Sequence, residues 1–503
     1  MTIGSLINKE TRTTQNIKSV KEMTILGIKI NCDASNVTDT NILAKIPTIK
    51  RDIHQWNRRG LTPIGKICIL KTLLISKLVH IFTALPNPSE QCLKDLEKLC
   101  FEFVWGSKVD KVKRTKLIQK YYKDGLNMID LKCFIKSLKI SWLKRLLRSN
   151  ADWNTSNLNE LPEIHQFLMY GHKKLRLLQT NTTNPFYSDL IGAWAEYNEQ
   201  YRPSIEQIIS ENIWFSNWTK FDMSIIKKWN HKGLRFISDL YNPKTGTIYS
   251  RHNLEQIYGI RVNFLCYAAL IRSLPKDIQK QVNKSLITNP IIPNKISQIT
   301  TDKKFSRTAY AIFVEQKRSN NDTSNARLRS KWTADIGDFV EGSLQMLMNA
   351  TTFTYIIYFH FKIIHRIYAS NSLLYKIRIA ENNLCTFCEQ QRETIYHLFW
   401  QCPKTQIFIK EILSHIKDTY LINININKVQ WFFLTDLSSI EMLIVTLIKI
   451  HIHKSRLKLI IPSIRICIEQ IKTEMNKEYI IAKTNNKLEH FERKWKNLKQ
   501  LLT

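Results

Sequence analysis

The sequence predicts a mainly α-helical protein, and its composition and apolar spacing both support that fold class. Glycine and proline number only 13 each among 503 residues, below their usual shares of about 7% and about 5%. Apolar residues recur at helical spacing over several long segments. Long helices are therefore favoured over a sandwich or a barrel, and the length allows about two to four domains.

Residues 62–85 form the strongest predicted helix. Thr62 can cap this helix, and Pro63 suits its first turn, where a missing N–H costs no hydrogen bond. Apolar residues at helical spacing are expected to face a core: Ile64, Ile67, Cys68, Leu74, Ile75, Leu78 and Phe82. Lys66 and Lys77 lie about three helical turns apart, so we expect them to share the outer face.

Two further amphipathic segments flank this helix. Residues 47–58 precede it, and residues 90–105 follow Asn87 and Ser89, either of which can cap a helix. The apolar side chains expected to be buried are Ile49, Ile53 and Trp56 in the first segment and Cys92, Leu96, Leu99, Cys100, Phe103 and Val104 in the second. Three consecutive helices with short links predict a helical bundle.

The segments after the bundle are predicted to mix helices with loops. A glycine-containing turn at 123–131 leads into a basic amphipathic helix over 131–148. The polar stretch 149–159 is predicted to be a linker, and loops are predicted at 242–246 and 319–325. We expect the residues between the 149–159 linker and the 319–325 loop to be mostly helical.

The C-terminal part contains further predicted helices at 352–376, 403–416 and 440–458. Residues 342–361 lack Asp, Glu, Lys and Arg, but their Ser, Gln, Asn, Thr and His side chains are too polar for a membrane span, so we expect a buried helix. The first residues lack the apolar core of a signal peptide. We therefore expect an intracellular protein without a membrane segment.

A metal-binding pattern, C-x2-C-x8-H-x4-C, is formed by Cys385, Cys388, His397 and Cys402. A close cysteine pair followed by a His/Cys pair is a usual source of ligands for tetrahedral zinc. Pro403 disfavours helical geometry at Cys402, so a turn should bring this cysteine back towards the metal. Four protein ligands leave no open position, which indicates structural Zn²⁺. The alternative is that the cysteines are small buried hydrophobes.

The other cysteines and histidines show no comparable pattern. The remaining seven of the ten cysteines are scattered, which argues against a disulfide framework and favours a reducing compartment. His360, His365 and His415 are spare imidazoles near the cluster, and packing or solvation is the more usual role for such residues. Neither a GxGxxG motif nor a P-loop occurs.

The charge balance predicts a polyanionic partner. The sequence has 75 Lys and Arg residues against 42 Asp and Glu residues, a formal net charge of +33, and nucleic acid is the leading partner for such an excess. Residues 108–148 hold 13 basic and three acidic residues, with Tyr121, Tyr122 and Trp142 interleaved. These rings could stack on bases or belong to the core. A basic solvated surface without a partner is the alternative.

Candidates for phosphate contacts with RNA and DNA lie in the 62–85 helix, after the 90–105 helix and beside the cysteine cluster. They are Lys66, Lys71, Lys77, Lys111, Lys113, Arg114, Lys116, Arg366 and Arg378. Each could instead be a solvated charge. Contacts to phosphate position a protein on nucleic acid but carry little sequence information.

A series of segments also occurs in a specific order along the chain. It comprises LGIKI (26–30), WNRRGLTPIGKICILKTLLISKLVHIFTALP (56–86), LEKLCFEFVWG (96–106), KDGLNMIDL (123–131), NPFYSDLIGAW (184–194), KKWNHKGLRFISDLY (227–241), EQIYGIRVNFLCYAALIRSLP (255–275), FHFKIIHRIYASNSLLYKIRI (359–379) and the cysteine cluster. In this order the segments resemble the C-terminal half of the reverse transcriptase encoded by LINE-type (non-LTR) retrotransposons, a class of transposable element.

The resemblance implies four parts in this chain. They are the edge of a polymerase palm (1–30), a basic, thumb-like helical bundle (31–150), a mixed, mostly helical connecting region (151–345) and a small zinc-stabilised C-terminal domain (346–503). The thumb would hold template and primer, and the zinc domain would bind RNA and target DNA. His365 and Arg366 match a His-Arg pair of the family. A nuclear location would follow from a chromosomal target, although no compact Lys/Arg-only run supports it.

The sequence departs from this family at the polymerase active site. Such polymerases hold two metal ions with palm carboxylates, usually on an aromatic-x-Asp-Asp turn, and this sequence contains no Asp-Asp pair. It begins where the palm is expected to end, and no counterpart of the family's endonuclease is found. A truncated reading frame or a gene model without its upstream part would explain this. We therefore expect nucleic-acid binding without polymerisation.

Two alternatives stay open. The chain could be part of an active RNA-directed DNA polymerase whose palm is encoded upstream. It could also be a zinc-stapled module that binds other proteins and no nucleic acid, in which case binding would show no steep dependence on salt.

Overall fold

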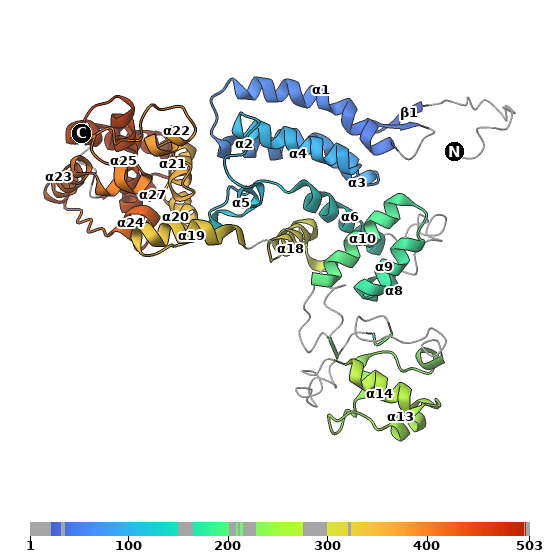
Figure 1. Cartoon of the computed structure of the whole chain (residues 1–503). Coiled ribbons are helices and arrows are strands. Elements are labelled where there is room, and N and C mark those ends of the chain that lie inside the picture. The colour runs from blue at the N-terminus through green and yellow to red at the C-terminus, as the bar shows by residue number, and fades with distance from the viewer. Residues whose placement is uncertain are drawn as a thin grey trace. The chain divides into compact units, whose positions relative to one another are not determined.

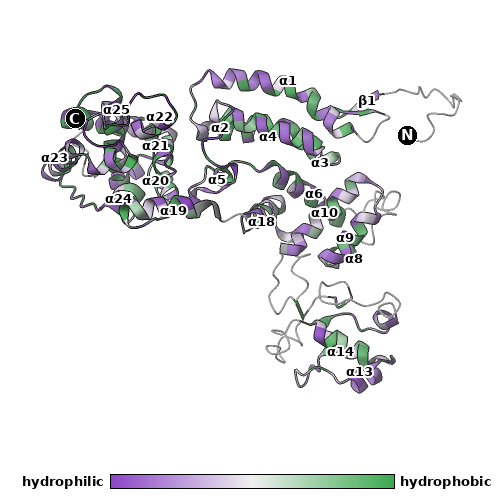
Figure 2. Cartoon of the chain, viewed as in Figure 1, coloured by the Kyte–Doolittle hydropathy of each residue, from purple (hydrophilic) through white to green (hydrophobic). Residues whose placement is uncertain are grey.

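A computed structural model describes residues 22–31, 36–148, 164–200, 208–209, 212–214, 228–274, 299–319, 323–496 and 498 (Figure 1). The described chain is mainly helical, as predicted, and its helices carry apolar stripes beside polar ones (Figure 2). The strands β1 (Glu22–Ile25) and β2 (Ile28–Asn31) pair as an antiparallel hairpin, with Ile25 opposite Ile28.

The chain divides into two compact units, and each draws on separated stretches of the sequence. The first unit comprises Met1–Pro47, Lys77–Asp95 and Asp130–Asn320, and the second comprises Thr48–Ser76, Leu96–Ile129 and Asn321–Thr503. The units therefore group the sequence differently from the four predicted parts, which stay a prediction. The cysteine cluster belongs to the same unit as much of the predicted bundle.

Elements of the first unit, besides the hairpin, are α3 (Val79–Ala84), α6 (Leu131–Arg148), α8 (Ile164–Met169), α9 (His172–Asn181), α10 (Pro185–Gln200), η4 (Ile237–Leu240), α13 (Arg251–Tyr258), α14 (Phe264–Ser273) and α18 (Phe305–Ser319). Helix α6 packs against α10 and α18 around fully buried residues such as Leu143 and Trp194. Trp142 lies against this core, and its Nε1 donates to the Thr83 carbonyl at 2.7 Å.

Elements of the second unit are α2 (Pro63–Ile69), η1 (Leu70–Leu74), α5 (Arg114–Ile118), η3 (Tyr121–Lys123), α19 (Thr323–Ile336), α20 (Ser343–Ala350), α21 (Thr354–Ile364), α22 (Asn371–Lys376), η5 (His397–Gln401), α23 (Pro403–Tyr420), α24 (Lys428–Phe433), α25 (Ser439–Leu457), α26 (Ile464–Thr484) and α27 (Leu488–Lys494). The central helix is α25, which packs against α20, α21 and α26. Helices α1 (Val37–Asn57) and α4 (Glu90–Trp105) and the turn η2 (Ile75–Leu78) contribute residues to both units.

Several predicted helix boundaries are confirmed. The Thr62 hydroxyl accepts a hydrogen bond from Gly65 N at 3.3 Å, with Pro63 in the first turn of α2. Ser89 caps α4 by accepting from Cys92 N at 3.2 Å. Helix α6 covers the predicted 131–148, and the turn at 242–246 closes with a 2.8 Å bond from Gly246 N to Asn242 O.

Other predicted helix boundaries were wrong. The 62–85 segment is not one α-helix but α2, a π-helical turn, a 3₁₀ turn and α3, and its Cys68 is exposed while the other six predicted core residues are buried. The 352–376 segment breaks into α21 and α22 because the backbone turns at Arg366, where φ is +56°. Helix α1 begins at Val37, well before the predicted 47–58.

Two predicted loops are not fully covered by the described residues. The predicted linker 149–159 lies outside them. Helix α19 begins at Thr323, inside the predicted loop 319–325. Among the described residues, only Pro63–Ala84 has the length and apolar composition of a membrane span, and Leu70 and Leu78 within it are fully buried by the protein.

The buried amine of Lys449 predicts a pH-dependent stability. Lys449 in α25 is fully buried, and its Nζ donates to the Trp431 carbonyl at 2.8 Å. Burial lowers the pKa of Lys449 to about 7, whereas an unfolded lysine has a pKa of about 10.4. Between these values the unfolded chain binds more protons than the folded one, so the free energy of unfolding should rise with pH.

The Lys449→Met variant should lose this part of the pH dependence. Urea unfolding at about pH 7.5 and about pH 9 measures it, because the difference between wild type and variant cancels all other titrating groups. Parallel stability profiles for the two proteins would show that Lys449 is charged in the folded state.

Candidate metal centre

The structure brings together the four residues of the predicted metal site. Ligand atoms of Cys385, Cys388, His397 and Cys402 all lie within 4.8 Å of one another. Their side chains are buried except that of Cys388, which is half-buried. The nine cysteines among the described residues are all free thiols, so no disulfide competes for these sulfurs.

Two of the six distances between these atoms match those of a tetrahedron around zinc, and all six are within 4.8 Å. Bonds of about 2.3 Å from zinc to sulfur and about 2.0 Å to nitrogen separate two sulfurs by about 3.8 Å, and a sulfur from a nitrogen by about 3.5 Å. Cys385 Sγ lies 3.8 Å from Cys402 Sγ, and Cys388 Sγ lies 3.4 Å from His397 Nε2. The residues present therefore fit a zinc ion.

Local backbone structure places the first cysteine pair. A turn closes where Glu389 N donates to Cys385 O at 2.8 Å, with Glu389 at a φ of +55°. A single antiparallel bridge between Leu384 and Arg392 holds the base of the loop. Backbone N–H groups of Cys388 and Phe387 point at the Cys385 sulfur. These N–H groups favour the thiolate, the form of cysteine that binds metal, but the hydrogen bond with Cys402 and burial outweigh them and raise the pKa of Cys385.

The second pair lies at the junction of η5 and α23. His397 begins η5, and Cys402 follows it with a ψ of 125°, the extended geometry predicted from Pro403. The pKa of Cys402 is lowered, mainly by a hydrogen bond from Cys385. Backbone N–H groups of Thr405 and Lys404, at the start of α23, lower it further. The helix N-terminus thus faces the sulfur with its positive end.

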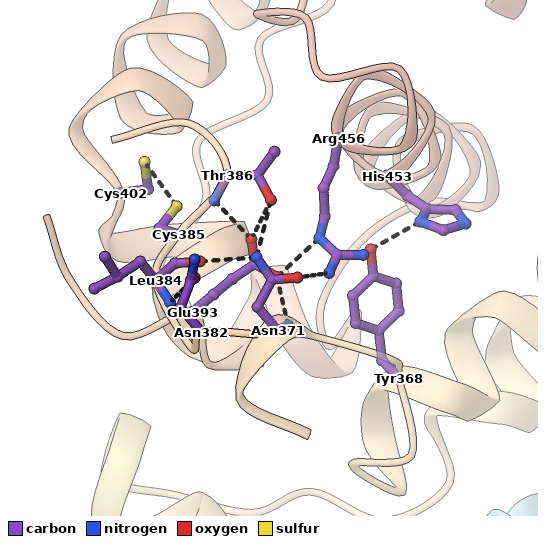
Figure 3. Close-up of polar contacts among 10 residues, drawn as sticks. All are labelled: Tyr368, Asn371, Asn382, Leu384, Cys385, Thr386, Glu393, Cys402, His453 and Arg456. Carbon is purple, nitrogen blue, oxygen red and sulfur yellow. Dashed lines mark hydrogen bonds and ion pairs between the residues drawn. The ribbon is translucent and has the colours of Figure 1, made fainter. Parts of the chain in front are cut away.

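A buried carboxylate connects this loop to the helices around it (Figure 3). Glu393 is fully buried and accepts hydrogen bonds from Asn371 N at 2.8 Å, from Thr386 N at 3.0 Å and from Thr386 Oγ1 at 2.8 Å. It also forms an ion pair with Arg456 of α25, whose Nε lies 2.8 Å from Oε1. Neither Glu393 nor Arg456 was identified from the sequence, because their pairing spans 63 positions.

Two further contacts complete this network. Arg456 Nη2 donates to Asn371 Oδ1 at 2.7 Å, and Asn371 Nδ2 donates to the Leu384 carbonyl at 2.8 Å (Figure 3). The Tyr368 hydroxyl bonds to His453 Nδ1 at 2.8 Å. The loop that carries Cys385 is therefore attached to α22 and α25 through side chains whose polar atoms are paired.

The arrangement supports a structural role for a metal ion. Three thiolates and one imidazole fill all four positions of a tetrahedral ion, which leaves none for a water or substrate. Zn²⁺ held by these residues would contribute binding energy to folding. His360 and His365 are not part of the site. His360 bonds to Ser343 Oγ at 3.0 Å, and His365 bonds to the Asp124 carbonyl at 2.6 Å.

The predicted phosphate ligands fall into different environments. Lys66 of α2 and Lys111, in the loop after α4, belong to one group with Lys362 of α21, which the sequence reading missed. Burial and then the positive charge of Lys111 lower the pKa of Lys66, and the same two causes lower the pKa of Lys362. Helix α2 also packs against α21. We call Lys66, Lys111 and Lys362 the lysine cluster.

Aromatic rings line the lysine cluster. The Lys66 Nζ lies 5.4 Å from the Phe103 ring centroid and donates to Asn57 Oδ1 at 2.9 Å. The Lys111 Nζ lies 5.9 Å from the Trp105 centroid, and the Lys362 Nζ lies 5.5 Å from the Tyr358 centroid. Among the described residues, no ion pair joins these three amines to a carboxylate.

The amines of Lys71 and Lys116 donate to backbone carbonyls within the second unit, which argues against phosphate contacts by these two residues. Lys116 is buried, with its Nζ 2.8 Å from the Lys123 carbonyl and 3.4 Å from the Glu341 carboxylate. The Lys71 amine donates to the Asn127 carbonyl, and burial lowers the pKa of Lys71 to about 8. Both amines support the 116–129 segment instead of facing solvent.

The other predicted cations remain near the surface. Arg114 pairs with Asp110 at 2.8 Å and stacks on Phe101, while Lys113 is exposed. Lys77 is half-buried and belongs to the first unit, whereas the lysine cluster belongs to the second. Arg366 pairs with Asp335 and lies over Trp332, and Arg378 is exposed at the end of α22.

No protein-family model matches this sequence. The metal centre and the lysine cluster are therefore interpreted from their own chemistry.

The metal centre predicts a measurable zinc content. The purified chain should carry one equivalent of zinc, and Cys388→Ser should lower this content and expose residues 380–415 to protease. Elemental analysis and limited proteolysis measure both effects. Cys68→Ser, which removes an exposed thiol outside the cluster, is the matched control. Full zinc content in the Cys388 variant, or an equal loss in the control, would contradict the assignment.

The Glu393–Arg456 ion pair predicts a large stability effect. Arg456→Met leaves a fully buried carboxylate without its cation, so the free energy of unfolding should fall by about 3 kcal/mol or more. Adding Glu393→Gln should restore part of the loss. Lys132→Met, which breaks the exposed pair with Glu90, should lower the free energy of unfolding far less, because solvent screens that pair. Similar losses for Arg456→Met and Lys132→Met in urea unfolding would argue against the network.

Proposed function

We propose that this chain binds RNA and DNA through phosphate contacts and catalyses no polymerisation with its own residues. In this proposal it is the nucleic-acid-gripping portion of a non-LTR retrotransposon reverse transcriptase, the family whose thumb and zinc-binding segments it resembles. The lysine cluster is the observation that carries the proposal. Three amines from separate chain segments converge in the second unit without a described carboxylate partner.

The convergence of like charges has a physical cost. The amines of Lys66 and Lys362 lie close enough to Lys111 for its positive charge to lower their pKa values. Such repulsion between like charges destabilises a folded protein. Solvated surface lysines avoid this cost by separating. A polyanion removes it, because each phosphate contact releases counterions and neutralises a cation.

The zinc centre supports the same function indirectly. Zinc held by three cysteines and one histidine stabilises its loop without taking part in chemistry. The helices that carry the lysine cluster and the metal centre belong to one compact unit. We propose that zinc maintains the fold on which the basic residues are displayed.

A protein-binding module is the second candidate, favoured by a different observation. Four apolar side chains are exposed at the end of α25 and just after it. Leu457, Leu459, Ile460 and Ile461 expose 65%, 80%, 45% and 59% of their surfaces. Exposed apolar patches of this kind mark interaction sites for other proteins. Binding to such a partner would respond weakly to salt, which separates it from nucleic-acid binding.

The salt dependence of binding tests the proposal. Filter-binding titrations of the full chain with RNA and with DNA should give affinities that fall steeply as salt rises from about 50 to about 200 mM. The combined Lys66→Gln, Lys111→Gln and Lys362→Gln variant should weaken both equally and reduce the slope of log affinity against log salt by about three. Its melting temperature should stay equal or rise, because repulsion is relieved.

A matched triple variant controls for total charge. Lys410→Gln, Lys417→Gln and Lys428→Gln remove three exposed lysines of the same unit and should leave the slope close to that of the wild type. An unchanged slope in the cluster variant, or the same reduction in both variants, would reject the cluster. A flat salt response of the wild type would reject nucleic-acid binding itself.

A further inference from the structure

A short segment beside the metal centre exposes apolar side chains between cations. Tyr375, Ile377 and Ile379 expose 51%, 53% and 70% of their surfaces. Lys376 and Arg378 alternate with them and are also exposed. Large aliphatic side chains in such positions are unfavourable in water, so this alternation requires an explanation other than burial in the core. We call residues 375–379 the alternating segment.

The alternating segment has a fixed backbone. Ile377 N donates to Leu373 O at 3.1 Å, Arg378 N to Tyr375 O at 3.0 Å and Ile379 N to Leu374 O at 2.8 Å. Arg378 has a φ of +60°, the left-handed geometry that ends a helix. The exposed apolar side chains are therefore held by a completed helix C-terminus and do not belong to a loose loop.

The network around the metal centre anchors the same element. Helix α22 begins at Asn371, whose N donates to the buried Glu393 carboxylate. The Asn371 side chain also bonds to the carbonyl of Leu384, the residue before the first metal ligand (Figure 3). The N-terminal end of α22 is thus attached to the metal loop, and its C-terminal end carries the exposed side chains.

Further cations surround the alternating segment. Partial burial and then the charges of Arg327, Arg366 and Lys376 lower the pKa of Lys331, which places α19 cations close to the end of α22. The carboxylate of Asp335 already pairs with Arg366. The acidic residue nearest in sequence is Glu381, which is exposed.

We propose that the alternating segment contacts unpaired nucleobases, with Tyr375, Ile377 and Ile379 against the bases and Lys376 and Arg378 on the flanking phosphates. This deepens the proposed function and rests on it, because it names single-stranded or unpaired nucleic acid as the preferred ligand. A nucleobase presents a flat apolar face. The phosphates on either side of it carry negative charges that are spaced one nucleotide apart. The segment offers exposed apolar and exposed basic side chains within five residues, and each kind suits one of these two features.

Charge complementarity favours nucleic acid over a protein. An apolar protein surface would leave Lys376 and Arg378 without partners, and their desolvation would be unfavourable. A membrane rich in anionic lipid could also accept both kinds of side chain. Anionic vesicles are therefore included as a probe that can overturn the assignment.

The test compares one single-stranded oligonucleotide with its duplex. The full-length Tyr375→Ser, Ile377→Ser and Ile379→Ser variant keeps every charge, so it should bind the single strand about tenfold or more weakly while its duplex affinity and salt slope stay unchanged. Fluorescence of a 2-aminopurine base in the strand should be quenched by the wild type and less by the variant. Zinc content and circular dichroism of the variant should equal those of the wild type.

Two other variants complete the design. Ile480→Ser with Ile481→Ser removes exposed aliphatic residues of α26 and should leave single-strand affinity unchanged. Lys376→Gln with Arg378→Gln should instead reduce the salt slope by about two, because phosphate contacts are lost.

The outcomes separate this inference from the proposed function. Equal losses for single strand and duplex, an equal loss in the α26 control, or a selective loss of binding to anionic phospholipid vesicles would overturn the alternating segment as a base contact. A wild-type chain that shows steep salt dependence together with any of these results would keep the proposed function. A wild-type chain without salt-dependent binding would overturn both.

Discussion

The buried carboxylate of Glu393 is the contact on which the surroundings of the metal centre depend. It accepts from Asn371 at the start of α22, from Thr386 in the metal loop and from Arg456 in α25. A buried charge is unfavourable unless it is paired and its lone pairs are used. These donors therefore cannot separate without leaving the carboxylate unsatisfied. Zinc bound by the four ligands would close the same loop from its other side, which makes the two constraints cooperative.

Features formed by residues close together in the sequence could be predicted. Contacts between residues far apart in the chain could not. The ligands Cys385, Cys388, His397 and Cys402 could be predicted because their spacing lies within one loop, and α2 and α4 because Thr62 and Ser89 cap the residues that follow them. The role of Lys116 could not be predicted, because its partner Glu341 lies 225 positions away. The start of α22 could not be predicted for the same reason, since its first N–H donates to the Glu393 carboxylate, 22 positions away.

The basic residues show how the fold places in different environments cations that look alike in the sequence. The sequence reading treated nine cations alike, but the fold assigns Lys71 and Lys116 to internal carbonyls and gathers Lys66 and Lys111 with Lys362. Lys362 had no local signal, because it lies in an apolar helix far from the basic segment. Partial burial of Lys66 and Lys362 and the positive charge of Lys111 beside them distinguish this group from solvated lysines such as Lys410. The repulsion is tolerated by a fold that the Glu393 network holds together.

Hydrogen exchange of the full chain with and without a zinc chelator tests the central claim most directly. Chelation should remove the protection of backbone amides over residues 384–406 and weaken it at the start of α22, whose first N–H bonds to Glu393. The amides of α2 and of α4 should keep their protection, because these helices are buried by apolar contacts. Identical exchange over residues 384–406 with and without chelator would show that no metal holds this loop, and would contradict the structural role assigned to the centre.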